Sequence, residues 1–215
     1  VNQAADPAVV LPATPERLDW AAYTPSGDNP DLPTLGGLTD SVLLHADGNL
    51  AVDLFGFVAV LAHFELSKYE TSGTDGEGVT LSQASVLEFT LTGIAPATAA
   101  SVFVGAGAVV DVNAGTIDTA DAVGFSASVS SLTLVLVTDD ARSYTGLAIS
   151  GLNADLVGID GLVARATNVN VQVNQAADPA VVLPATPERQ DWAAYTPGGD
   201  NPDLPTLGGL PDSVS

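Results

Sequence analysis

The chain has 215 residues and a formal net charge of −21, because 26 acidic residues are set against five Lys and Arg. Such a field repels nucleic acids and anionic membrane surfaces and attracts divalent cations, and no apolar run is long enough for a membrane-spanning helix. We therefore expect no nucleic acid partner and no membrane insertion, and the absence of Cys excludes disulfides and thiol chemistry.

A long repeat organises the sequence. Residues 1–42 recur as residues 173–214 at an offset of 173 − 1 = 172 residues, which is the size of a domain. Three positions differ between the copies: Leu18 is replaced by Gln190, Ser26 by Gly198 and Thr39 by Pro211. We expect a piece of a tandem array, although duplication of a linker within one protein would give the same pattern. The predicted organisation is a Pro-rich connector at 1–42, a β-rich repeat domain at 43–172 and the start of the next repeat at 173–215.

The connector is expected to be largely extended, because each of its X-Pro steps disfavours the helical region for the preceding residue. Residues 15–23 could form one helical turn capped by Thr14, with Trp20 and Tyr23 on one face. Trp192 and Tyr195 repeat this pair in the second copy. The four aromatic residues are predicted to make inter-repeat contacts, with burial at the end of their own domain as the alternative. In the first case residues 1–42 pack along a domain, and residues 173–214 project towards the next unit or lie across it as an added strand.

From residue 43 onwards the pattern is typical of strands. Residues 49–68 indicate a long strand bent or bulged at Gly56, and residues 87–91 and 132–136 show the alternation of a half-buried strand. Gly-, Asp-, Pro- and Thr-rich turns are expected at 71–78, 94–98, 113–121 and 138–142. The predicted fold is all-β, an elongated, mainly antiparallel, sandwich-like domain of about eight to ten strands. The closely spaced glycines at 146–161 leave a β-solenoid as the alternative.

Catalytic and binding motifs are sparse. His45 and His63 are the two imidazoles, and no nucleophile elbow accompanies them, so we expect no enzymatic activity and no catalytic residues. Calcium is the one cofactor that the sequence suggests, because carboxylate and amide oxygens cluster around an Asn-Ala-Gly turn. The candidate ligands are Asp111, Asn113, Asp118 and Asp121, and the alternative is a solvated turn in which Asp bonds its own backbone.

Residues 43–175 resemble the tandem repeats of giant bacterial surface proteins of the adhesin-like or haemolysin-like type. The resemblance lies in the order of three signatures, at residues 48–60, at 101–105 with 123–126, and at 142–145 with 156–162 and 169–174. The Pro-rich connector departs from the family pattern. The resemblance implies structural or adhesive work outside the cell and no catalysis.

These observations together predict a structural repeat of a long extracellular filament, stalk or adhesin, giving spacing, cohesion and surface display. The expected location is extracellular or on the cell surface, and the expected partners are neighbouring copies of the same repeat. A module that binds glycans or another ligand is the alternative function, with surface glycans as its partners. An exposed shelf of aromatic side chains would distinguish it.

Overall fold

The computed structural model describes residues 3, 17–20, 22–24, 35, 38–76, 78–182 and 185–212, and these residues form strands, turns and irregular segments without helix. No helix in this part of the chain could therefore cross a membrane. The strands are β1 (Val42–Leu54), β2 (Val58–Thr74), β3 (Thr80–Thr92), β4 (Ala100–Ala106), β5 (Val109–Asp111), β6 (Thr116–Asp118), β7 (Val123–Val129), β8 (Ser131–Asp139), β9 (Arg142–Val157), β10 (Arg165–Ala177) and β11 (Thr196–Pro197).

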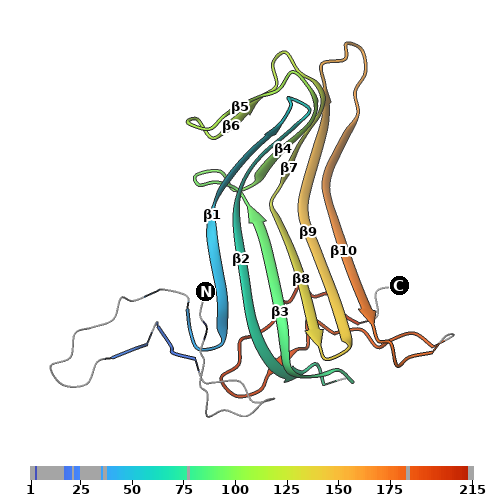
Figure 1. Ribbon diagram of the computed structural model, residues 1–215. Helices are drawn as coiled ribbons and strands as arrows, with labels where there is room; N and C mark the ends of the chain where they lie inside the picture. The colour runs from blue at the N-terminus through green and yellow to red at the C-terminus, as the bar shows by residue number, and fades with distance from the viewer. Residues whose placement is uncertain are drawn as a thin grey trace.

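One large antiparallel sheet dominates the molecule (Figure 1). Strands β1, β2, β9 and β10 each run through both halves of the sheet, and two pairs of strands, β3 with β8 and β4 with β7, fill the space between β2 and β9. Strands β3 and β8 fill the half nearer the start of β1, called here the proximal half, and β4 and β7 fill the distal half. The order across the proximal half is thus β1, β2, β3, β8, β9 and β10, and across the distal half it is β1, β2, β4, β7, β9 and β10.

The two faces of the sheet differ in composition. Residues paired across neighbouring antiparallel strands share a face, so the register defines rows of side chains. One row reads Ser67, Glu88, Val135, Gly146 and Asn174 from β2 to β10. We call this side the covered face and the opposite side the open face.

The covered face carries two hydrophobic clusters. In the proximal half, β-strand side chains such as Tyr69, Val86 and Val137 pack against Trp192, Leu207 and other residues of the C-terminal segment. In the distal half, the hairpin of β5 and β6 covers a smaller cluster that contains Ala59 and Phe103. The C-terminal segment, in orange and red in Figure 1, crosses the proximal end of the sheet. We call residues 189–212 the covering segment.

The prediction of an all-β, mainly antiparallel fold is confirmed, and the strands form a sheet where the alternative expected a solenoid. The fold is sandwich-like in that a second layer packs on one face of the sheet, and that layer is largely an irregular segment. The predicted long strand at 49–68 is wrong: Phe55 and Gly56 have positive φ and form the hairpin turn between β1 and β2. The predicted boundary between residues 172 and 173 lies within β10, which continues to Ala177.

Candidate inter-repeat interface

The covering segment begins with a tight turn that directs two aromatic side chains at the sheet. The Asp191 carboxylate accepts hydrogen bonds from the backbone N–H groups of Ala193 and Ala194 (2.8 and 3.0 Å). Asp191 thus caps the turn of residues 192–194, whereas the sequence suggested a threonine cap five positions earlier. The turn carries Trp192 and Tyr195, which are 1% and 6% exposed.

Trp192 occupies a space left by a glycine on β9. A Cβ atom added to Gly146 would lie 2.7 Å from the indole ring of Trp192 and 2.2 Å from a methyl group of Leu207. The strand can therefore accept the large ring because residue 146 has no side chain. This explains why an aromatic residue of an irregular segment packs directly against the centre of a sheet.

Asn174 of β10 joins three points of the covering segment. Its Oδ1 accepts a hydrogen bond from Trp192 Nε1 (3.1 Å), and its Nδ2 donates to the carbonyl oxygens of Gln190 (2.9 Å) and Pro211 (2.8 Å). Asn174 is 7% exposed, so these bonds satisfy polar groups that are withdrawn from water. Both ends of the segment are held by this one side chain.

Tyr195 makes the matching contact on β2. A Cβ atom on Gly73 would lie 2.6 Å from the Tyr195 hydroxyl, so this ring also lies over a glycine. The Tyr195 hydroxyl is 2.9 Å from Thr71 Oγ1, which donates to the carbonyl of Pro202 (2.6 Å). Residues 196–197 then pair with β2 as the short strand β11. The covering segment is therefore attached to β2 on one side and, through Asn174, to β10 on the other.

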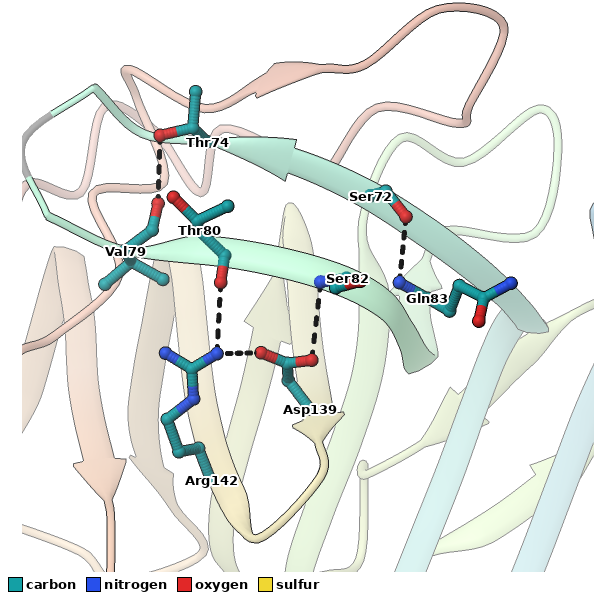
Figure 2. A network of polar contacts seen from close by, with 8 residues as sticks. All are labelled: Ser72, Thr74, Val79, Thr80, Ser82, Gln83, Asp139 and Arg142. Carbon is teal, nitrogen blue, oxygen red and sulfur yellow. Dashed lines mark hydrogen bonds and ion pairs between the residues drawn. The ribbon is translucent and has the colours of Figure 1, made fainter. Parts of the chain in front are cut away.

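Two further carboxylates are buried at the proximal end of the sheet, and one of them, Asp75, contacts the covering segment. Asp75 is 4% exposed; its Oδ1 accepts from the backbone of Gly78 and Val79, and its Oδ2 accepts from Asp191 N (3.2 Å). Asp139 pairs with Arg142 at the turn between β8 and β9 and also accepts from Ser82 N (3.3 Å). Figure 2 shows the contacts of Asp139 with Ser82 and Arg142, and Arg142 also donates to the carbonyl of Thr80 there.

Burial under the covering segment shifts the pKa of several groups. It raises the pKa of the Tyr69 and Tyr195 phenols, with the neighbouring Glu88 adding to the effect on Tyr69. Burial also raises the pKa of Glu88, and the hydrogen bond from Tyr69 to its carboxylate (3.1 Å) offsets part of this. The Tyr69 hydroxyl also lies 3.4 Å from the carbonyl of Asp203 in the covering segment. Because their pKa values are raised, the two phenols stay neutral at physiological pH.

The first copy has the same local structure in a different setting. Trp20 N donates to Leu38 O (3.0 Å) as Trp192 N does to Leu210 O (3.1 Å), and Ala22 N donates to Asp19 Oδ1 (2.9 Å) as Ala194 N does to Asp191. However, Leu18, Tyr23 and Leu35 are 38%, 37% and 41% exposed, whereas their counterparts in the second copy are buried. In the described part of the first copy, these two hydrogen bonds thus form although Leu18, Tyr23 and Leu35 are exposed.

A short junction joins the first copy to the sheet that follows it. Arg17 donates to the carbonyl of Asp40 (2.7 Å) and pairs with the carboxylate of Glu70 on β2 (2.6 Å). Glu70 N donates to Ser41 O (3.3 Å), directly before β1 begins at Val42. Arg189 repeats part of this pattern, because it donates to the carbonyl of Asp212 (3.4 Å).

The predicted contact residues therefore fall in two environments. Trp192 and Tyr195 pack on the sheet of their own chain. The second copy therefore does not project away from this sheet, contrary to the prediction, and the arrangement matches the alternative of burial at the end of its own domain. Trp20 is partly buried and Tyr23 is exposed. Sequence reasoning missed Asn174, Gly146 and Gly73; the one available signal was the position of Asn174 inside the repeated stretch.

The predicted calcium ligands lie in and beside the hairpin of β5 and β6. Asp111 accepts from the backbone of Asn113 and Ala114, and Asp118 accepts from Ala120 N, as in ordinary Asx turns. Asp121 follows on the chain, before β7. No group of three or more acidic or histidine side chains gathers to hold a metal within the described ranges.

The two histidines lie on the covered face, beyond the covering segment. His45 Nδ1 is 3.0 Å from Ser67 Oγ, and His63 Nδ1 is 3.1 Å from Asn49 Oδ1. The His45 ring also lies near two largely exposed carboxylates, with Nε2 3.4 Å from Asp47 Oδ1 and Nδ1 3.7 Å from Glu65 Oε1.

A groove of about 610 Å³ with a mixed polar and apolar lining lies beside the covering segment on the same face. Hydroxyl and amide side chains line it, including Ser131, Thr133, Ser150, Asn170 and Gln172. Its lining contains no aromatic ring on which a sugar could stack. No protein-family model, curated protein or solved structure was found to match this chain.

Proposed function

We propose that this chain is a structural repeat of a long extracellular assembly, in which each copy of the repeated segment covers the sheet that precedes it and joins it to the sheet that follows. One observation carries the proposal. Trp192 and Tyr195 of the second copy are buried on a sheet, whereas Leu18, Tyr23 and Leu35 of the first copy are exposed although two local hydrogen bonds recur there. A segment of this kind is ready to dock on a further copy of the sheet.

The junction supports a stiff connection between successive units. In a tandem array, the segment that covers one sheet would also place its arginine beside the next sheet, as Arg17 is placed beside Glu70. Its last residues lead into β1 without intervening chain, because Ser41 already bonds to β2. A connection with no free residues restricts rotation far more than a flexible tether of the same sequence length.

The test is a chain lengthened by one period of 172 residues, studied by small-angle X-ray scattering. The proposal expects the maximum dimension to increase by a fixed step and the curve to fit one rigid arrangement of two sheets. A scattering curve that requires freely reorienting units would overturn it. Arg189→Ala in the lengthened chain should loosen the joint, and Arg17→Ala, which affects only the first joint, is the matched control.

The groove beside the covering segment favours a second candidate, the binding of a small polar ligand such as a surface glycan. Its hydroxyl and amide groups offer hydrogen-bond donors and acceptors in a row. Screening the chain against a glycan array tests this function, with Thr133→Val as the variant that should lose binding. The absence of an aromatic ring from the lining makes the structural function the one we prefer.

A further inference from the structure

The open face of the sheet is apolar across all six strands. One row of paired residues reads Ala46, Leu66, Phe89, Leu134, Leu147 and Val173 from β1 to β10. The next row reads Gly48, Phe64, Leu91, Leu132, Ile149 and Val171. The face continues distally through Val60, Val102, Phe125 and Leu156.

Neither hydrophobic cluster of the described structure includes a residue of these two rows. Every side chain in the rows is partly accessible, and nearby residues are more so: Leu136 is 38% exposed and Phe125 is 50% exposed. Contiguous apolar surface of this extent on a soluble protein marks an interaction site.

Charge separates the two faces further. The two rows contain no charged residue, although the chain carries 26 acids. The row beside them on the covered face, in contrast, contains Asp47 and Glu65. Lys68 lies at the proximal border of the open face, and Glu70 beyond it is paired with Arg17. Two copies of so acidic a chain can approach most closely where neither carries charge.

We infer that the open face packs against the open face of a second copy of this chain, so that two sheets form a sandwich. Strands about 4.8 Å apart and a rise of about 3.4 Å per residue give the face an area on the order of 800 Å². A pair of such faces would bury on the order of 1,600 Å², which is the size of a stable protein interface. Apolar side chains of two facing sheets then interdigitate about 10 Å apart.

The shape of the open face favours a sheet over the chain's own first copy. The repeated segment packs through Trp192 and Tyr195, which need the glycines at 146 and 73 on the covered face. Apart from Ala46 and Gly48 on the edge strand β1, the rows of the open face present Leu, Phe, Ile and Val, and the Phe64 ring already lies next to Gly48. Ridges of this kind match another pleated sheet, and they leave no space for an indole ring.

The test is sedimentation equilibrium of the full chain over a range of concentrations. The wild-type mass should be twice 21.6 kDa. Leu134→Glu places a charge on the open face and should weaken association by at least about 100-fold, because the charge would be buried without a partner. Asn49→Glu is the matched control: it adds the same charge at an exposed position of β1 on the covered face, and should leave the mass unchanged.

Circular dichroism and thermal melts show whether both variants are folded, and Ile149→Glu provides a second change in the same face. A wild-type chain that stays monomeric overturns the inference, whether the face is then covered by the first copy or by a different partner. Association that Asn49→Glu and Leu134→Glu disrupt equally also overturns it. The inference rests on the proposed function only in that both involve contacts between copies of this chain. It fails on the mass of this chain, whereas the proposed function fails on the rigidity of a lengthened one.

Discussion

Replacing Trp192 with Ala tests the central packing contact of the covering segment. The side chain is 1% exposed, and truncating a fully buried Trp costs about 3–5 kcal/mol. The change also removes the donor to Asn174 Oδ1 and leaves that buried acceptor unpaired, which adds about 1–3 kcal/mol. We expect a loss of about 4–8 kcal/mol in the free energy of unfolding, or about 8–32 °C in Tm for a chain of this size.

Urea unfolding followed by circular dichroism measures the effect, and the repeat supplies a matched control. Trp20→Ala removes the same side chain from the same local sequence, where it is only partly buried and belongs to neither hydrophobic cluster. We expect it to cost about 1 kcal/mol. Equal losses for the two variants, or a loss below about 1 kcal/mol for Trp192→Ala, would refute the structural distinction between the copies.

Three further predictions concern single side chains. Gln190 is fully buried with Oε1 unpaired among the described residues, so Gln190→Leu, which installs the residue found at Leu18, should stabilise the chain by about 1 kcal/mol in the same urea assay. The pKa of Glu88 is raised in the fold, so its contribution to stability is present below the unfolded value of 4.5 and is lost as pH rises through the folded value. Glu88→Gln should remove this loss, and Tm profiles that are parallel for variant and wild type would contradict the assignment. If the predicted calcium site exists, millimolar calcium should raise Tm, and Asp111→Asn with Asp118→Asn should abolish the rise; a midpoint unaffected by calcium or chelator would eliminate the site.

The sequence pattern was sufficient for the strands but not for their arrangement. Alternation placed Leu132, Leu134 and Leu136 on one side of a strand, and the structure confirms this in β8. The turn at Gly56 was read as a bend because apolar residues flank it on both sides. A two-residue hairpin turn with positive φ at Phe55 has no strong sequence signal.

The candidate interface was predictable in its aromatic residues but not in its geometry. The repetition of Trp and Tyr pointed to a contact, yet periodicity could not show which sheet they would meet. That depends on Gly146 and Gly73, whose lack of side chains matters only once β9 and β2 lie beneath the rings. Asn174 likewise becomes important through three partners that are 16 to 37 residues away in the chain.

The long hairpins of the sheet fix where an extended chain would be anchored and where it would reach outwards. The polypeptide enters the sheet at Val42 and leaves it at Ala177, both at the proximal end, while the turns after β1 and β9 lie at the far end (Figure 1). Phe55 and Val163 at those tips are 95% and 88% exposed. Units joined in this way would be linked through their proximal ends, so tension along the assembly would pass through those ends. The distal turns would project sideways and stay available to contact another surface.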